Sequence, residues 1–397
     1  MHVSPEKLAR AQKAMQASGL DGLVCRIAEH VLYFTGYWPH GQIGAAVVPA
    51  SGNPVLLVGE VEAALEFGSF SPSEQVEVVT FPYESAEVMR GPNDVLALAL
   101  PGVFKKLGLE GKTIGIEQSF EGVNVGIFQG EVKYPGQPAM EMLKSVFPHN
   151  ELRDATGLLL KLRQVKSPEE VEAIRLAVET AAFGLKAARE TARPGMKETE
   201  LAAVVESAIH IRGTGYKGIA QARGYAAVHS GPRSASQWAH YALSTERVIQ
   251  DGDMVIIELG SFADGYWADL TRNIAVGKVD PRFDDLYAAL CETQQAAYAA
   301  ARPGVPLSDL VRAARGVLEK YGFAGYWPHG LGHGVGFAYH EGPAVHIANP
   351  QPVEAGMVLT VEPGLYLPGV GGVRPEDMIV VHEDSVEVLS DAIPRVL

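Results

Sequence analysis

Cysteine is scarce in this chain, and its scarcity excludes several kinds of structure. Only Cys25 and Cys291 occur among the 397 residues, and no CxxC pair is present. We therefore expect neither a disulfide framework nor a structural zinc knuckle. A reducing compartment, the cytoplasm, fits this cysteine content. No apolar run reaches about 18 residues, and the start MHVSPEKLARAQKAMQ lacks the apolar core of a signal peptide. We therefore expect neither a membrane span nor export.

Basic charge is also limited. The net charge is −14, with 33 Lys and Arg against 47 Asp and Glu, and no basic stripe stands out. Nucleic acid and anionic membranes are therefore poor candidates for partners. A length of 397 residues, with 47% hydrophobic and 20% charged residues, is typical of a globular protein with two domains.

The N-terminal part has the pattern of a small α/β domain. Helical spacing over residues 5–18 ends at Gly19, and a further helix is expected within 84–110. Ser167-Pro168 followed by two glutamates is a strong helix start. We place the domain boundary shortly before it, which gives domains 1–155 and 156–397. Strands are predicted from short apolar runs between turn residues at 22–25, 45–48, 55–58, 76–79 and 114–116.

The C-terminal part should combine helices with strands, so the fold class is α/β (α+β). Arg193-Pro194-Gly195 and Arg302-Pro303-Gly304 each follow a predicted helix, which hints at an internal duplication. Paired strands are expected around an Asp264-Gly265 turn. The predicted helices are 197–210, 281–301 and 307–321, and the predicted strands are 254–260, 268–276, 357–361 and 378–382.

Histidine and carboxylate residues concentrate where these strands meet turns. Glu258 and Asp269 flank the predicted hairpin, and two close carboxylates repel each other unless they are protonated or bridged by a cation. His329, His333 and His340 lie among six glycines between 325 and 342, which suggests a shaped pocket. Any one of these residues alone is more often a surface acid or an ordinary loop histidine.

Three more segments complete the set. Glu362 ends one predicted strand, Arg374 and Glu376 open the next, and His229 and His240 precede the hairpin. Four carboxylates and one imidazole suit hard or borderline ions such as Mn²⁺, Co²⁺ or Zn²⁺. A pair of such ions could activate water and polarise a carbonyl group. No HExxH motif is present, which excludes a thermolysin-like match, and GHGVG lacks the lysine of a phosphate-binding loop.

In these residues the sequence resembles the creatinase/prolidase/aminopeptidase P family, the pita-bread metallopeptidases, over nearly the whole chain. The resemblance implies a creatinase-like N-terminal domain and a pita-bread catalytic domain. It also implies two divalent metal ions per subunit, hydrolysis of Xaa-Pro bonds in dipeptides or short peptides, and a homodimer. The segments that carry it are YFTGY, PVLLV, LRQVKSPEEVEAIRLA, GDMVIIELG, GYWADLTRN, HGLGHGVG, VEPGLY and VRPED.

The resemblance further implies a role for each matching residue. Asp269 and Glu376 match bridging carboxylates, and Glu362 also matches the acceptor of a proton from water. The implied metal ligands are Glu258, Asp269, His333, Glu362 and Glu376. The implied catalytic residues are His240, His340 and Glu362, and the implied substrate-binding residues are His329, Tyr366 and Arg374.

The sequence departs from the family pattern in two places. Glu258 stands where the family usually has aspartate, so the second metal could bind more weakly or with altered geometry. The segment before the hairpin is longer than usual, so the catalytic histidine falls near Trp238 by strict count and on His240 with an insertion; His229 is the alternative.

Two other functions are alternatives to an Xaa-Pro peptidase. One is a creatinase-like, metal-free C–N hydrolase, and the other is a non-catalytic peptide-binding module on the same fold. All five ligand positions keep metal-capable residues, which favours the peptidase. The sequence does not separate a dipeptidase from an aminopeptidase.

Overall fold

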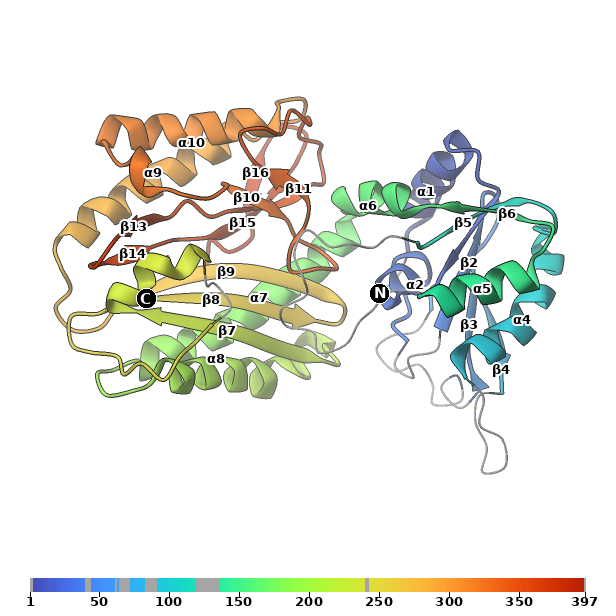
Figure 1. Ribbon diagram of the computed structural model, residues 1–397, viewed down its shortest axis with the longest axis horizontal. Helices are drawn as coiled ribbons and strands as arrows, with labels where there is room; N and C mark the ends of the chain where they lie inside the picture. Colours follow the sequence, from blue (N-terminus) through green and yellow to red (C-terminus); the bar gives the residue numbers. More distant parts are fainter. Residues whose placement is uncertain are drawn as a thin grey trace. The chain divides into compact units, whose positions relative to one another are not determined.

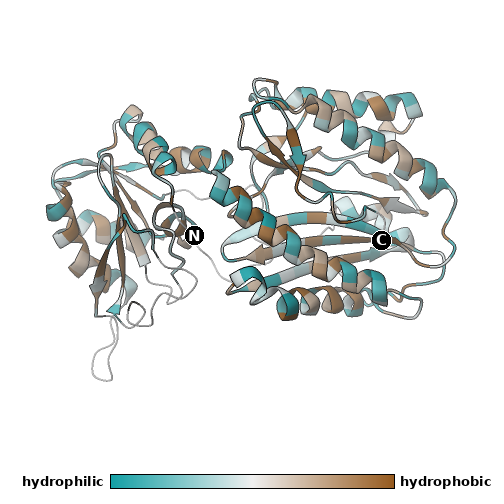
Figure 2. Cartoon of the chain, turned by 180° about the vertical axis from the view of Figure 1, so that it is seen from behind, coloured by the Kyte–Doolittle hydropathy of each residue, from teal (hydrophilic) through white to brown (hydrophobic). Residues whose placement is uncertain are grey.

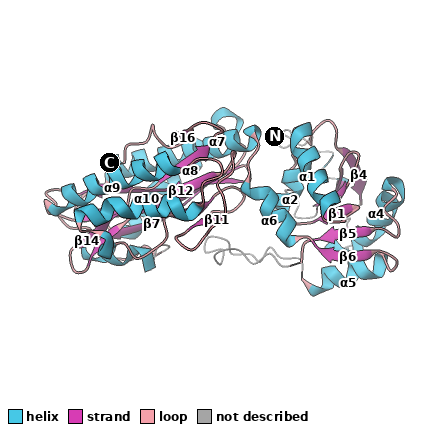
Figure 3. Cartoon of the chain, turned by 90° about the horizontal axis from the view of Figure 1, so that it is seen from above, coloured by secondary structure: helices cyan, strands magenta, loops and turns pink. Residues whose placement is uncertain are grey.

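The computed structural model describes residues 3–39, 44–60, 63, 72–82, 91–118, 136–239 and 243–395. The chain divides into two compact units, Met1–Leu162 and Arg163–Leu397. Both units mix helices with sheets, which confirms the predicted α/β class (Figures 1 and 3). The domain boundary at 155/156 stays a prediction. Among the described residues, none of the helices has the length and apolar character that crossing a membrane requires.

The N-terminal unit is built on a single six-stranded sheet. Its strands are β1 (Gly22–Cys25), β2 (Gly44–Pro49), β3 (Val55–Gly59), β4 (Glu77–Phe81), β5 (Thr113–Ile116) and β6 (Glu151–Asp154). Its helices are α1 (Pro5–Ala17), α2 (Ala28–Thr35), α4 (Pro92–Leu107) and α5 (Gln137–Val146), and α6 (Thr156–Gln164) follows β6. The strand order is β4-β3-β2-β1-β5-β6, with β1 antiparallel to β2 and parallel to β5.

Local sequence signals explain much of this unit. The side chain of Ser4 accepts a hydrogen bond from the Lys7 amide at the start of α1, and the helix ends just before Gly19, as predicted. The five predicted strands correspond to β1 to β5. The helix expected within 84–110 is α4, which follows Gly91; the part of that prediction at 84–90 lies outside the described residues.

The C-terminal unit contains four long helices and three sheets among its described residues. The helices are α7 (Pro168–Thr191), α8 (Glu198–Gly213), α9 (Arg282–Ala300) and α10 (Leu307–Tyr321), and the short 3₁₀ segments are η2 (Tyr216–Gly218), η3 (Gly231–Ala239) and η4 (Ala324–Tyr326). One sheet has the order β7-β8-β9, with β7 (Ala222–Ser230), β8 (Met254–Ala263) and β9 (Tyr266–Ala275). A second has the order β11-β10-β12-β15-β16, with β10 (Gly332–Gly334), β11 (Glu341–Val345), β12 (Val358–Val361), β15 (Asp377–Val381) and β16 (Val386–Val388). The third pairs β13 (Leu365–Leu367) with β14 (Gly371–Val373).

The helix pairs of this unit lie against different sheets. Helices α7 and α8 contact β9 and β7, whereas α9 and α10 contact β14 and β11 (Figure 1). The helices carry mixed polar and apolar residues (Figure 2), while β8, with the sequence MVIIELGSFA, is mostly apolar. Leu290 and Leu310 from the helices join Leu359 and Ile379 from the strands in one buried core. Apolar burial therefore holds the strands that carry the polar residues described below.

The two helix pairs share the same connection. Arg193-Pro194-Gly195 joins α7 to α8, and Arg302-Pro303-Gly304 joins α9 to α10. The two glycines have φ angles of 90° and 85°, a left-handed conformation that glycine adopts most readily. Their amides donate to the carbonyls of Ile249 and Val353, each at 2.9 Å. The structure therefore contains the same helix–RPG–helix connection twice, as the sequence hints.

The duplication also positions two carboxylates. Each helix pair is followed by a left-handed glycine just before a strand, Gly252 with a φ of 89° and Gly356 with a φ of 88°. Glu258 comes six residues after the first glycine, and Glu362 comes six residues after the second. Each repeat thus contributes one glutamate, and the two glutamates lie in the same region of the unit although they come from different sheets.

Candidate metal centre

The β8–β9 hairpin is closed by the predicted turn. Ala263 pairs with Tyr266 across Asp264 and Gly265. These two turn residues have φ angles of 46° and 96°, and positive values at both positions are what a two-residue type I′ hairpin turn needs. The predicted hairpin is therefore confirmed.

This hairpin places its two carboxylates on one face. Glu258 pairs with Thr271, and Asp269 pairs with Gly260 in the antiparallel register. Side chains alternate between the faces of a sheet, so Glu258, Thr271 and Asp269 all project to the same side. Asp269 is fully buried, and Glu258 is nearly so.

His333 and Glu362 come from the second sheet. The His333 amide donates to Thr360 Oγ1 at 3.0 Å, and the Glu362 amide donates to the Leu331 carbonyl at 2.9 Å. His333 Nδ1 lies 3.0 Å from the Gly334 carbonyl, a contact that places the ring proton on Nδ1 and leaves Nε2 as a ligand atom.

The His333 ring brings the two sheets together at their carboxylates. His333 Nε2 lies 3.4 Å from Asp269 Oδ2 and 3.4 Å from Glu362 Oε1. His340 Nε2 lies 3.4 Å from Asp269 Oδ2 as well, and the two imidazole centroids are 4.1 Å apart. Asp269 therefore lies between two histidines that the sequence predicted for the site.

Glu376 is joined to the hairpin by two hydrogen bonds. Its amide donates to the Thr271 carbonyl at 3.1 Å, and Thr271 Oγ1 donates to Glu376 Oε2 at 2.7 Å. The second bond leaves the other carboxylate oxygen, Oε1, pointing into the cluster. Glu376 is fully buried.

The donor atoms of this cluster fit a divalent ion. Four buried ligand atoms have no hydrogen-bond partner among the described residues. They are the two carboxylate oxygens of Asp269, His333 Nε2 and Glu376 Oε1. Buried polar atoms are normally paired, so four orphans at one point indicate a missing partner of positive charge. The cluster contains three groups of residues, and within each group the ligand atoms lie within 4.8 Å of one another. The groups are Asp269–His333–His340, His333–Glu362–Glu376 and Glu258–Asp269–Glu376. These groups include all five predicted metal ligands.

The pKa values of residues in the cluster also indicate a site for cations. Burial, together with the charges of Asp269 and Glu362, raises the pKa of Glu376 well above its usual value. Burial opposes the charged form of His333, yet the carboxylates of Asp269 and Glu362 raise its pKa well above the usual value. The cluster therefore holds protons unless cations replace them.

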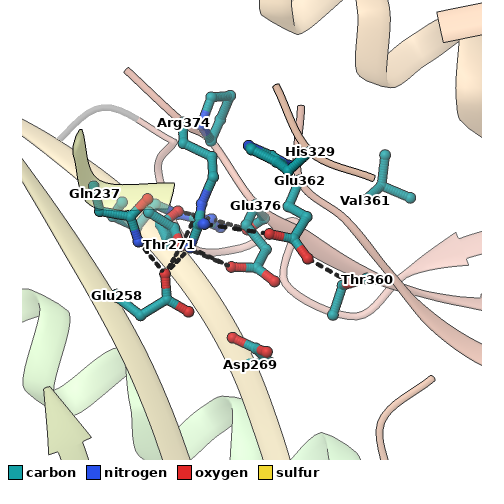
Figure 4. A network of polar contacts seen from close by, with 12 residues as sticks. Gln237, Glu258, Asp269, Thr271, His329, Thr360, Val361, Glu362, Arg374 and Glu376 are labelled. Atoms are coloured by element: carbon teal, nitrogen blue, oxygen red, sulfur yellow. Dashed lines mark hydrogen bonds and ion pairs between the residues drawn. The ribbon is translucent and has the colours of Figure 1, made fainter. Parts of the chain in front are cut away.

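Glu258 has a different environment from the other ligands. Gln237 Nε2 donates to Glu258 Oε2 at 2.8 Å, Arg374 forms an ion pair with the same oxygen, and the Tyr339 hydroxyl donates to Oε1. Arg374 also lies 3.3 Å from Glu362 Oε2 (Figure 4). This arginine therefore joins Glu258 to the rest of the cluster.

The predicted substrate-binding residues lie beside this arrangement. His329 Nε2 is 3.0 Å from the Tyr366 hydroxyl, and His329 Nδ1 is 2.8 Å from the Gly330 carbonyl. Tyr366 lies 3.3 Å from Gln237 Oε1. A hydrogen-bonded chain thus runs from His329 through Tyr366 and Gln237 to Glu258.

Only one of the two candidates for the catalytic histidine lies among the described residues. His240 lies outside the described residues. His229 is fully buried in β7 and pairs with Ile256, two positions along β8 from Glu258. It therefore belongs to the same face of the sheet as Glu258.

Three polar residues of the site were not singled out from the sequence. Thr271 lies two residues after Asp269 on the same strand, so strand alternation could have indicated it. Tyr339 directly precedes His340. Gln237 gave no local signal, because η3 brings it to Glu258 from another part of the chain.

Known proteins resemble this chain over nearly its full length. The model of metallopeptidase family M24 matches residues 172–383, and that of the creatinase/prolidase N-terminal domain matches residues 7–165. The Xaa-Pro dipeptidase of Pyrococcus furiosus is 29% identical over 387 residues, which is 97% of each chain. The crystal structure of the prolidase from Pyrococcus horikoshii is 28% identical, with a TM-score of 0.75 over 97% of this chain and 98% of that one.

Proposed function

Because this chain belongs to metallopeptidase family M24 and also carries a creatinase/prolidase N-terminal domain, we propose that it hydrolyses the Xaa-Pro peptide bond of dipeptides or short peptides. The observation that carries the proposal is the cluster of carboxylates and histidines with four unpartnered buried ligand atoms. Relatives named Xaa-Pro dipeptidase, 29% identical over nearly their whole length, support the choice of substrate.

We infer two divalent ions per subunit, Mn²⁺, Co²⁺ or Zn²⁺. Asp269 and Glu376 would bridge them, His333 and Glu362 would hold the first, and Glu258 would hold the second. This division is supported by two of the ligand groups, since Glu376 occurs with His333 and Glu362 in one and with Asp269 and Glu258 in the other. When bound, such ions would polarise the carbonyl of the scissile bond and make a water molecule more acidic.

The side chains of the cluster differ in exposure, which supports different roles for them. Asp269 and Glu376 are fully buried, whereas the side chains of Glu362 and His340 are each 14% exposed. We assign Glu362 to accept the proton of the attacking water and His340 to donate to the oxygen that becomes negative. Both roles need groups on the side from which a substrate arrives.

The remaining assignments concern the substrate and the proton shuttle. His329 and Tyr366 would hold the substrate, since their hydrogen bond fixes both side chains beside the cluster. Arg374 would carry positive charge toward a substrate carboxylate while it contacts Glu362. His240 remains the proposed catalytic histidine, with His229 as the alternative.

The two other functions are less well supported. A creatinase-like, metal-free hydrolase would not need four adjacent carboxylates, whose mutual repulsion the single charge of Arg374 only partly offsets. A non-catalytic peptide-binding module would not need His333 and His340 in contact with Asp269. The site keeps all of these groups.

We also propose that the chain works as a homodimer in the cytoplasm. The dimer follows from the family resemblance, and the free thiols of Cys25 and Cys291 suit a reducing compartment.

A matched substrate panel tests the proposed specificity. Xaa-Pro dipeptides, Xaa-Pro-Yaa peptides and the same peptides with alanine in place of proline should be assayed with Mn²⁺-loaded protein. We expect turnover of the proline peptides and little of the alanine peptides, and the length preference will separate a dipeptidase from an aminopeptidase. Equal turnover of the alanine series would contradict the proposal.

A further inference from the structure

Gln294 is a polar residue on the apolar face of helix α9. It is fully buried, and so are Leu290 and Ala297, which lie about one helical turn away on either side. A buried amide that makes no hydrogen bond is unfavourable, so a glutamine at this position needs partners. The neighbouring Thr293 finds its partner inside the helix, at the Ala289 carbonyl. Gln294 instead reaches out of the helix to the strands of the metal centre.

The amide of Gln294 joins the two chain segments that carry Glu362 and Glu376. Its Nε2 donates to the Val361 carbonyl at 3.0 Å and to the Pro375 carbonyl at 3.2 Å. Each of these carbonyls belongs to the residue directly before one of the two glutamates. An amide nitrogen carries two protons, so both are used. The amide oxygen has no hydrogen-bond partner among the described residues, so the two strands alone orient this side chain.

This bridge lies where the sheet stops joining the two strands. The antiparallel pairing of β12 with β15 ends at the pair Val361–Asp377. Beyond it, the amides of the two ligand glutamates donate to carbonyls of other segments. A proline follows one glutamate and precedes the other, and proline has no amide proton with which to extend the ladder. Gln294 therefore links the two segments just where their own hydrogen bonds end.

We propose that Gln294 is a positioning residue for the metal centre. By holding two carbonyls on one amide, it fixes the distance between the chain segments that present Glu362 and Glu376. The carboxylates of these glutamates lie side by side (Figure 4), and with His333 they form a group whose ligand atoms lie within 4.8 Å of one another. The inference rests on the metal centre of the proposed function and assigns it a support on a helix that contributes none of the proposed ligands.

A purely structural role for Gln294 predicts a different result. If this side chain served only the stability of the fold, its replacement would lower the free energy of unfolding and leave metal binding by the folded protein unchanged. A positioning role predicts that metal binding changes as well, because the two glutamates are then free to move apart. Partners that orient metal ligands contribute about tenfold to hundredfold to metal affinity.

Gln294→Met is the main variant for this test. Methionine has nearly the length and volume of glutamine, so it keeps the core filled while it removes both donated hydrogen bonds. Gln294→Asn is the second variant. It keeps the amide, but its side chain is one methylene shorter, which takes the amide out of reach of at least one carbonyl. Thr293→Val is the matched control, because Thr293 is equally buried on the same helix and donates only to the Ala289 carbonyl.

Two measurements on the metal centre are combined with urea unfolding of the metal-free proteins. Titration with Mn²⁺, in which electron paramagnetic resonance reports free Mn²⁺, gives the affinity, and the visible absorption of the Co²⁺ form reports the geometry around the ion. We expect Gln294→Met to bind Mn²⁺ about tenfold to hundredfold more weakly than the wild type and to shift the Co²⁺ spectrum. Gln294→Asn should change both in the same direction, and it provides the comparison if Gln294→Met does not fold. Thr293→Val should match the wild type in both.

Two results would overturn the inference while leaving the proposed function intact. One is wild-type Mn²⁺ affinity with an unchanged Co²⁺ spectrum in a folded Gln294 variant. The other is an equal loss of affinity in Thr293→Val, because the loss would then come from a disturbed helix. A wild-type protein that binds no Mn²⁺ at all would instead remove the metal centre itself, and with it the proposed function.

Discussion

Replacing Thr271 with valine should weaken metal binding by the cluster that contains Glu376. Thr271 is fully buried, and its hydroxyl donates to Glu376 Oε2 at 2.7 Å while it accepts from Arg374 Nη2 at 2.6 Å. A hydroxyl has one proton to donate, and the shorter of its two carboxylate contacts is the one to Glu376 rather than the 3.2 Å contact to Glu258. The bond fixes Glu376 with its other oxygen aimed into the cluster.

The size of the effect can be worked out from these contacts. Partners that orient a metal ligand contribute about tenfold to hundredfold to metal affinity. A hydrogen bond to a charged group contributes about 1.5–3 kcal/mol, which matches that range. We therefore expect the Mn²⁺ affinity of the cluster to fall by about tenfold to hundredfold in Thr271→Val, as measured by titration of the metal-free protein.

Thr293→Val is the matched control. Thr293 is also fully buried in this unit, but its hydroxyl donates only to the Ala289 carbonyl of its own helix, at 2.7 Å. Both variants should lower the free energy of unfolding of the metal-free protein, and only Thr271→Val should change metal affinity. If the two variants bind Mn²⁺ equally well, the role given to Thr271 is wrong.

Two further predictions concern a buried ion cluster and the proton shuttle. Glu341→Gln should lower the free energy of unfolding by about 3 kcal/mol at pH 7, because it leaves Arg163 and Lys166 buried without their carboxylate. Those cations lower the Glu341 pKa despite its burial, so their stabilisation is present above the usual glutamate pKa and is lost as the pH falls through the folded-state pKa. Urea unfolding of both proteins between pH 7 and pH 3 should show the difference shrinking; a constant difference would refute this. His240→Ala should lower kcat by about a hundredfold or more with bound metal unchanged, and the same effect in His229→Ala alone would show that His229 is the catalytic histidine.

Short-range signals in the sequence were sufficient for the hairpin and for several helices. Asp264-Gly265 marks a turn whose conformation is accessible to few residue pairs, and alternation then determines which residues share a face. Ser167 caps α7, as the Ser-Pro-Glu-Glu pattern predicts, and it also shares a capping box with Glu170. These features depend on residues within a few positions of one another.

Longer-range features could not be predicted in the same way. Strand β7 was not predicted, because Arg223 and Gly224 interrupt its apolar pattern and its identity comes from nine pairs with β8. The environment of Glu258 was also not visible, since Gln237, Tyr339 and Arg374 come from three separate segments. The sequence indicated which residues meet at the centre, but not which of them already have partners.

Metal dependence of turnover is the most direct test of the proposed chemistry. The protein should be stripped exhaustively of divalent ions, with the residual metal content measured, and then assayed on an Xaa-Pro dipeptide before and after Mn²⁺ is returned. Turnover should vanish with the metal and recover as the cluster around Asp269 and His333 is refilled. Full turnover by protein that contains no detectable divalent ion would contradict a metal-dependent mechanism.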